Sequence, residues 1–317
     1  MIEGLLAVWL NTVTIVILAF VIANITISIF VSLFSEAFIS FHVKSRKVVL
    51  WLLILLPWLT SICVALIFLT GYRVLTAERQ FSHWHHMGVF NGLSWHGATL
   101  IIAVVFSFYV LGKKLIQLKR QHNDLAHLMS FSKRLSHDVF EIEIVESSAF
   151  TAGFINKKCF ITSGMLNQMT EKELAVVIGH ERAHAKMNDP LKKWLFSFFT
   201  DFFIPPLGKY FKLHMMLAME QDADNAVINN KITPTFVAST LVKAARLNAL
   251  YPTIKTNDLI VNFGTDVLDQ RVYFLLGKIN LKPVNKLVTA TLVIVILAIS
   301  LYSIDGVHHL IEALLSH

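Results

Sequence analysis

Four long apolar segments, separated by polar stretches, set the pattern of hydrophobic and polar positions along the chain. They cover about residues 5–34, 48–70, 96–111 and 287–304. A helix that crosses the hydrocarbon core of a bilayer needs about 20 predominantly apolar residues, so each segment predicts a transmembrane helix. Pro57, inside the second segment, should kink that helix.

The polar region between the third and fourth segments predicts a separate α+β domain. Residues 114–137 predict an amphipathic stalk helix, and the alternation of apolar and acidic residues over 140–146 predicts a half-buried strand. Residues 150–155 predict a turn-like link, and residues 158–163 predict the next strand. The expected division is three transmembrane helices in 1–112, the polar domain in 113–285, and a fourth transmembrane helix with a short tail in 286–317.

A capped helix follows this predicted sheet. Thr170 and Glu173 have the spacing of a capping box, and the apolar residues 174–178 would bury the turns that come next. The run Asn188–Pro190 should end the helix.

The same helix contains the pattern H-E-x-x-H, formed by His180, Glu181 and His184. Positions i and i+4 lie on one face of a helix, so the two imidazoles can bind one Zn²⁺, with Glu181 beside them as a general base. The motif alone also occurs by chance, with no metal bound.

A second predicted helix supplies the missing ligand. Glu220 and Asp224 are again four residues apart. A catalytic zinc needs three protein ligands and an open position, and Glu220 can be the third ligand. Asp224 can accept the free N–H of a ligating histidine, which fixes the tautomer of that ring. His214, one helical stretch earlier, is expected to be a partly exposed histidine and no ligand.

H-E-x-x-H followed by E-x-x-x-D resembles the gluzincin peptidases. The segments 148–154 and 158–166, followed by the capped helix, resemble the BlaR/MecR-type membrane metallopeptidases, which are antirepressors in β-lactam signalling. The pair Ala223-Asp224 is similar to the second motif of the HtpX and CAAX prenyl-protease families. The chain departs from the BlaR/MecR pattern at two places. It has Ala223 where that family usually has Cys, and it has Met187-Asn188-Asp189 where that family usually has Arg-x-Asp. The resemblance covers about residues 140–275.

The resemblance implies an α-helical integral membrane protein with an α+β gluzincin (zincin-like) metallopeptidase domain inserted between transmembrane helices 3 and 4. Peptidases of this kind hold the substrate backbone on an edge strand near the metal. We expect this strand to be Lys158, Cys159, Phe160, Ile161, Thr162 and Ser163, although an interior position in the sheet is an alternative. In a later predicted helix, 266–276, Arg271 or Tyr273 could stabilise the oxyanion, and a structural salt bridge is the alternative for Arg271.

Composition and charge agree with a membrane protein. The chain is 55% hydrophobic and 15% charged, with a mean hydropathy of +0.61. The formal net charge of +7 invites a nucleic-acid interpretation, but the basic residues cluster beside apolar segments, where membrane topology explains them, so we expect no direct nucleic-acid binding. Cys63 and Cys159 are too few for a disulfide framework, and we expect both to pack as small hydrophobes.

The basic residues also predict the orientation of the chain. Positive loops stay in the cytoplasm, and Arg73 and Arg79 in the second loop are offset by Glu78. We therefore expect a multi-pass protein of a bacterial-type inner (plasma) membrane, with the N-terminus outside and the peptidase domain in the cytosol. The residues that place these segments inside are Lys44, Arg46, Lys47, Lys113, Lys114, Lys119, Arg120, Lys282 and Lys286.

Two further segments have alternative interpretations. The His-rich stretch His83, Trp84, His85, His86 predicts a membrane-interface loop anchored by Trp84 and Trp95, with metal binding as the alternative. The aromatic segment 195–206 is too short for a span and ends in a Pro pair, so it either packs inside the domain or dips into the membrane interface.

Together these features predict a membrane-embedded zinc endopeptidase with one Zn²⁺ per chain, held by His180, His184 and Glu220. Its expected partners are the lipid bilayer and a protein substrate, either a cytosolic repressor or a membrane protein. Residues 305–317 are too few for the sensor domain of BlaR/MecR receptors, so we expect a separate sensor partner or a signal through the spans. HtpX-like quality control and a non-catalytic receptor or scaffold are the alternatives.

Overall fold

The computed structural model of the protein describes residues 1–34, 40–75, 88–229, 231–249 and 258–315. These residues form two compact units. The first contains α1, most of α2, the first part of α3, and α10. The second unit contains Lys114–Pro283, which begins within α3, together with the start of α2 up to Leu50.

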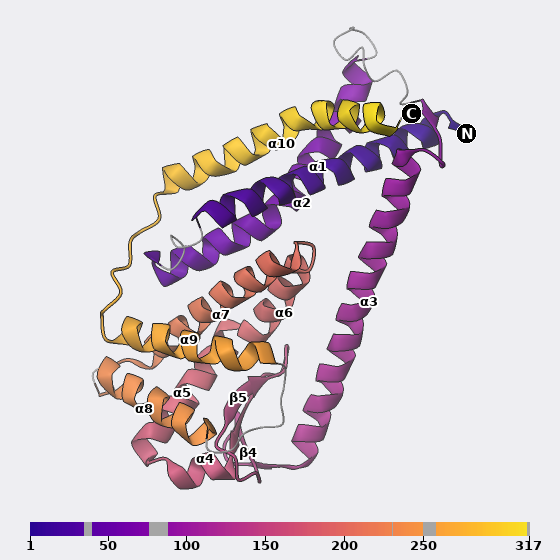
Figure 1. Cartoon of the computed structure of the whole chain (residues 1–317). Helices are drawn as coiled ribbons and strands as arrows, with labels where there is room; N and C mark the ends of the chain where they lie inside the picture. The colour runs from indigo at the N-terminus through magenta and orange to yellow at the C-terminus, as the bar shows by residue number, and fades with distance from the viewer. Residues whose placement is uncertain (35–39, 76–87, 230, 250–257, 316–317) are drawn as a thin grey trace. The chain divides into compact units, whose positions relative to one another are not determined.

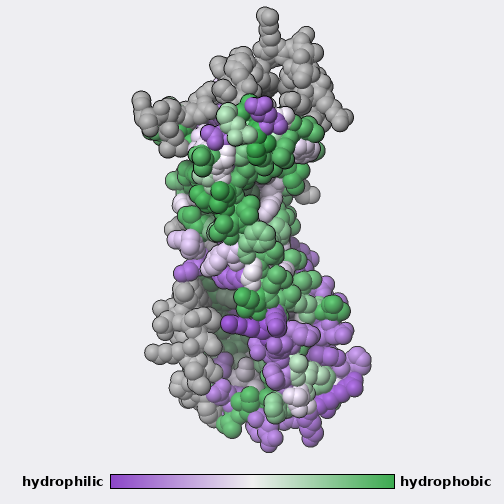
Figure 2. Space-filling model, turned by 90° about the vertical axis from the view of Figure 1, so that its right-hand side faces the viewer, coloured by the Kyte–Doolittle hydropathy of each residue, from purple (hydrophilic) through white to green (hydrophobic). Residues whose placement is uncertain are grey.

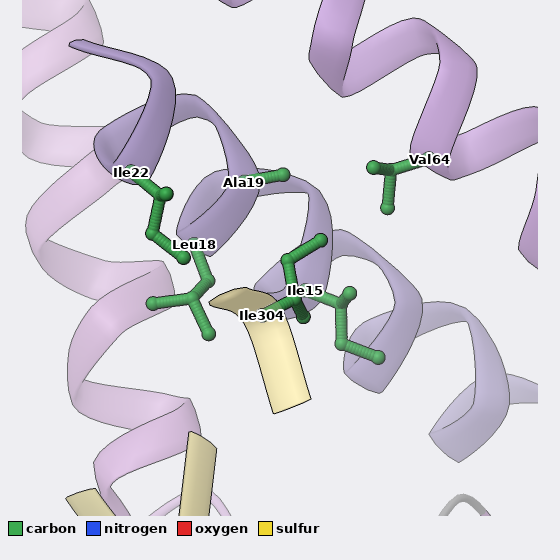
Figure 3. Packing of buried hydrophobic residues seen from close by; sticks show 6 residues of the cluster. All are labelled: Ile15, Leu18, Ala19, Ile22, Val64 and Ile304. Carbon is green, nitrogen blue, oxygen red and sulfur yellow. The ribbon is translucent and has the colours of Figure 1, made fainter. Parts of the chain in front are cut away.

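The first unit is built from apolar helices (Figure 1). These are α1 (Leu5–Phe34), α2 (Val43–Leu75), which contains Pro57, and α10 (Lys286–Leu315). Ile15, Leu18, Ala19 and Ile22 of α1 pack with Val64 and Ile304, one residue each from α2 and α10 (Figure 3). Two short strands, β1 (Ile2–Glu3) and β2 (Val89–Phe90), pair antiparallel beside α1.

Helix α3 (Trp95–Ser130) joins the third apolar segment and the predicted stalk into one continuous helix. The sequence predicted two elements, because the composition changes at Lys113 and Lys114. A change from apolar to polar side chains does not interrupt the backbone hydrogen bonds of a helix, so the stalk continues the span. On the face shown in Figure 2, hydrophobic residues cover the region of the apolar helices and hydrophilic residues gather over the second unit.

In the described residues, four helices are long and apolar enough to span a membrane: Leu5–Leu33, Val43–Phe68, Trp95–Ser130 and Leu287–Ile304. This confirms the four predicted spans. The His-rich stretch 83–86, which includes Trp84 as the first expected membrane anchor, lies outside the described residues. Trp95, the second, contacts the ring of His308 at a centroid distance of 5.3 Å. Cys63 and Cys159 are both free; Cys159 is buried and Cys63 is exposed.

A four-stranded sheet opens the second unit, in the order β3-β4-β6-β5. Strand β4 pairs parallel with β6, and the other two pairs are antiparallel. The strands are β3 (Ser132–Arg134), β4 (Val139–Ile142), β5 (Ala149–Ala152) and β6 (Lys158–Thr162).

This order corrects the prediction for the substrate strand. The segment Lys158–Ser163 forms β6 and the start of α4; β6 lies between β4 and β5, so its backbone groups are already paired. The error came from residues 150–155, which were predicted as a turn-like link. Ala149–Ala152 is in fact strand β5, and β5 is the outer strand on that side of the sheet in the described residues.

Alternating residues give the sheet two buried faces. Val139, Cys159 and Ile161 point to one face, where they pack with side chains of α5. Phe140 and Phe160 point to the other face, where they pack with side chains of α3. Both faces are therefore covered by helices, which explains why β6 is almost entirely buried.

Six helices complete the second unit (Figure 1). The helix from residue 258 begins earlier than the predicted 266–276, and the aromatic segment 195–206 forms the end of one helix, a turn and the start of the next. The helices are α4 (Ser163–Gln168), α5 (Glu171–Met187), α6 (Asp189–Thr200), α7 (Pro205–Val227), α8 (Pro234–Ala249) and α9 (Asp258–Leu275).

Candidate active site

Helix α5 begins and ends where the sequence predicted. Thr170 Oγ1 accepts from the backbone N–H of Glu173, and the Glu173 carboxylate accepts from the backbone N–H of Thr170, which completes the capping box. Asn188 stops the helix in a left-handed conformation at φ 58°. The capping box fixes the start of the helix, and the buried side chain of Val176 helps fix its rotation against the core, so His180 and His184 both face inward.

Three potential ligand atoms converge between α5 and α7. Nε2 of His180 lies 3.1 Å from Nε2 of His184, and the carboxylate oxygens of Glu220 lie 3.2 Å and 3.5 Å from these two nitrogens. Zinc–ligand bonds of about 2.0–2.1 Å in a tetrahedron separate neighbouring ligand atoms by about 3.3 Å. The three donors therefore fit one tetrahedral Zn²⁺ with a position left open.

A buried carboxylate lies behind each histidine. Nδ1 of His180 is 2.9 Å from Oδ1 of Asp224, as expected from the sequence. Nδ1 of His184 is 2.8 Å from Oδ2 of Asp189, a residue that was not predicted to lie beside a ligand. Carboxylates in this position hold the ring so that Nε2 points toward the metal. The signal that could have revealed Asp189 is an acidic residue one turn beyond the second histidine.

The electrostatics of these groups favour a cation. Burial opposes protonation of His180, but the carboxylates of Asp224 and Glu220 outweigh it and raise the pKa of His180 to about 9. Burial also opposes ionisation of Glu220, yet His180, His184 and Arg271 lower the pKa of Glu220 well below its usual value. The ionised carboxylates around the two imidazoles therefore favour a positive charge at this position, which a divalent cation can supply.

Glu181 points into the same cavity and is held by a residue of the outer strand. Thr151 Oγ1 of β5 lies 2.8 Å from Oε2 of Glu181 and 2.8 Å from its backbone oxygen. A hydroxyl has one hydrogen to donate, so it serves one of these acceptors at a time. Thr151 was not predicted as a site residue, because residues 150–155 were expected to form a turn-like link and Ala149–Ala152 is strand β5.

Arg271 and Tyr273, the two expected oxyanion candidates, lie in different environments. Arg271 donates two hydrogen bonds to Asp224, at 2.8 Å and 2.7 Å, and its Nη1 lies 3.3 Å from Glu220. Burial lowers the pKa of Arg271, but Asp224 outweighs it and the net shift is upward. Tyr273 is 46% exposed and does not line the cavity, so the structure does not bring it to the ligands.

A cavity of about 490 Å³ surrounds these groups. Its walls come from β5, α5, α6, α7, α8 and α9, and Lys193 of α6 lies at its rim, 3.4 Å from Glu220. The loop before β5 also contributes, through Ser147 and Ser148. This volume can accept several residues of a polypeptide in extended form.

Helix α7 is also bound by the start of α2. Arg46 donates to the side chain of Gln221, and Lys47 pairs with Asp222, so the two residues that follow Glu220 are both held. His214 was expected to be partly exposed, but the structure buries it. Burial and the charge of Arg46 lower the pKa of His214 to about 4. No local pattern in the sequence predicts these contacts, because they join residues 175 positions apart.

Comparison with known proteins agrees with this geometry. Residues 113–250 match Peptidase family M48, and the match includes His180, Glu181, His184 and Glu220. Among curated proteins, none matches the chain. Residues 113–250 are therefore similar to the zinc metallopeptidases of Peptidase family M48, and the described part of the chain has four candidate membrane spans.

Proposed function

We propose that this protein is a membrane-embedded zinc endopeptidase in which His180, His184 and Glu220 bind the metal and Glu181 is the catalytic base. The observation that carries the proposal is the convergence of three ligand atoms within 4.8 Å of one another, in a cavity that also contains Glu181. Asp224 and Asp189 hold the two imidazoles, and Arg271 neutralises Asp224 and Glu220.

The residue types assign the proton transfers. His180, His184 and Glu220 would hold the Zn²⁺, which would supply acidification of a bound water and polarisation of the scissile carbonyl. Glu181 takes a proton from the attacking water and passes it to the leaving amine. Thr151 keeps the Glu181 carboxylate directed into the cavity. Lys193, at the rim, contributes positive charge close to the reacting groups.

We propose that β5, rather than β6, holds the substrate backbone. The carbonyl of Ser148 accepts from the N–H of Thr162 at 3.0 Å. In an antiparallel ladder the bonded positions alternate, so the backbone groups of Ala149 and Thr151 face away from β6. These groups can pair with an extended substrate beside Glu181.

The substrate class follows from two different observations. The contacts of Arg46 and Lys47 beside Glu220 connect the first turn of a candidate span to a ligand helix, which supports signal-dependent cleavage of a repressor, as in BlaR/MecR. The buried Ala223 beside Asp224 supports HtpX-like quality control of membrane proteins instead. If the protein cleaves a repressor, a stable repressor fragment should appear on stimulation. If it serves quality control, misassembled membrane proteins should accumulate in a deletion strain.

The domain division and orientation belong to the same proposal. Residues 1–112 and 286–317 supply the spans, and residues 113–285 supply the peptidase domain on the cytosolic side of an inner (plasma) membrane. The clusters Lys113–Lys114 and Lys119–Arg120 support this orientation through the excess of positive charge on cytoplasmic segments.

The test uses two variants of the purified full-length protein. Glu181→Gln should keep stoichiometric zinc and lose at least about 100-fold in proteolysis, because the general base is gone. His180→Ala should lose both zinc and activity. Metal analysis and cleavage of an unfolded protein measure the two quantities. Glu181→Gln cleaving as fast as the parent would refute the assigned base, and a parent chain without zinc or activity would favour the scaffold alternative.

A further inference from the structure

A second cavity, of about 970 Å³, adjoins the catalytic one. Three residues, Thr151, Pro190 and Lys193, line both cavities. The second cavity therefore begins where the catalytic cavity ends and continues past the end of β5. We call it the stalk groove, because α3 forms one of its walls.

The stalk groove has three walls of different origin. The first is α3, with Leu115 and Leu118; the second is the turn between β5 and β6, with Phe154 and Ile155; the third is α6, with Trp194. The ring centroids of Phe154 and Trp194 lie 6.2 Å apart, and the two rings are tilted by 59°. Polar residues such as Gln121 stand among these apolar ones. The mixture is typical of a binding groove with an apolar floor.

Contacts at both ends hold the α3 wall in place. Lys114 donates to Ser197 at 2.7 Å and pairs with Asp201 at 3.0 Å, which joins α3 to α6 and the turn after it. Further along α3, Leu125 and Leu128 pack against the sheet beside Phe140 and Phe160. The helix thus bridges α6 and the sheet and leaves the groove between its two attachments.

We propose that the stalk groove binds an apolar side chain of the substrate, on one side of the scissile bond, and so sets the cleavage preference. The occupant is the substrate chain because the groove shares Thr151, Pro190 and Lys193 with the cavity that Glu181 lines. Ile155 lies in the turn just past the end of β5. An extended substrate advances about 3.3 Å per residue, so we place the bound side chain about two to four residues from the bond that is cut. This inference rests on the proposed proteolytic function.

The chain offers a matched pair of variants. Ile155 is 90% exposed and lines the groove, whereas Val145 is 68% exposed, lies on another loop of the same sheet and lines neither cavity. Neither side chain supports the fold, so Ile155→Glu and Val145→Glu should both fold. A second pair on α3 is Leu118→Glu, in the groove, with Ile116→Glu, outside it, as its control.

The experiment digests a proteome-derived peptide library with each full-length variant and determines the cleavage sites by mass spectrometry. The parent should favour an apolar residue at one position two to four residues from the cut, by about tenfold or more over an acidic residue. Ile155→Glu and Leu118→Glu should lose that preference and gain one for Lys or Arg at the same position. Val145→Glu and Ile116→Glu should match the parent.

The outcomes separate the two proposals. If the parent cleaves peptides but Ile155→Glu has an unchanged profile, the stalk groove does not contact the substrate, and a lipid or detergent occupant is then the better explanation. If the parent and Glu181→Gln are equally inactive on the library, the failure lies with the proteolytic function itself.

Discussion

At the residue scale, the site depends on side chains that hold the reacting groups at fixed positions. Thr151 and Asp189 touch Glu181 and His184 and are outside the motif itself. Both are contributed by elements that come before or after the motif helix. Their roles can be tested by substitutions that keep size and remove one hydrogen-bonding function.

Thr151→Val should lower kcat with little change in KM. Valine has the shape of threonine without the hydroxyl, so Glu181 loses a hydrogen bond of about 1 kcal/mol, which corresponds to about fivefold in rate. Steady-state kinetics on a fluorogenic peptide measure the split. Thr151→Ser keeps the hydroxyl and should restore most of the rate; if serine is as slow as valine, the hydroxyl is not what positions Glu181.

Asp189→Asn should weaken zinc binding. The amide is a poorer partner for the N–H of His184 than a carboxylate is, and loss of such a partner typically reduces metal affinity about 10–100-fold. Competition with a chelator measures the change. Glu171→Gln, which neutralises an exposed carboxylate on the first turn of α5, is the control and should bind zinc like the parent. Equal affinities for all three proteins would contradict a role for Asp189.

At the scale of elements, α3 and α6 are joined through one partly buried carboxylate. Asp201 pairs with Lys114 and Lys212, and the side chain of Lys114 is only 3% exposed. Burial raises the pKa of Asp201, but the two lysines outweigh it and the net shift is downward. A carboxyl group with a lowered pKa in the folded state stabilises the protein above its unfolded pKa of about 3.9.

Asp201→Asn should therefore destabilise the protein by about 3 kcal/mol at pH 7, because Lys114 is left buried without its carboxylate. The difference from the parent should shrink as the pH falls from about 4 toward the lowered pKa of folded Asp201, because in this range Asp201 binds a proton in the unfolded chain but stays ionised in the folded protein. Denaturant unfolding followed by tryptophan fluorescence gives both values. Lys212→Met removes the more exposed partner and should cost less than about 1 kcal/mol. If the difference in stability between Asp201→Asn and the parent is unchanged at pH 2, the ion pair is not its cause.

At the scale of the whole molecule, the basic residues have two roles. Lys47 and Lys114 belong to clusters that predict a cytoplasmic side, and both form ion pairs with acidic residues of the peptidase unit. If positive segments stay in the cytosol, the residues that pair with Lys47 and Lys114 lie there too.

Cysteine labelling tests this orientation. Leu93→Cys, in the loop before α3, should react with a membrane-impermeant maleimide in intact cells, whereas Lys231→Cys, between α7 and α8, should react only after permeabilisation. Replacing Cys63 and Cys159 by serine removes the background. Labelling of Lys231→Cys in intact cells would place the peptidase domain outside.

The sequence by itself determined the local features of this protein. Length and apolarity specified the four spans, because a bilayer demands about 20 apolar residues whatever lies around them. The spacing of His180 and His184 and the capping box of Thr170 and Glu173 specified a metal-binding helix, because both follow from helix geometry.

The tertiary structure decided what depends on distant neighbours. Whether a strand is interior or at an edge is a property of its partners. The sequence favoured 158–163 as an edge strand, with an interior position as the alternative, and the sheet order places β6 inside and β5 at the edge in the described residues. The carboxylate behind His184, the hydroxyl beside Glu181 and the wall that α3 adds to the stalk groove likewise arise from packing between separate elements. No local pattern encodes such contacts, because each is set by how whole helices and strands bury their apolar faces against one another.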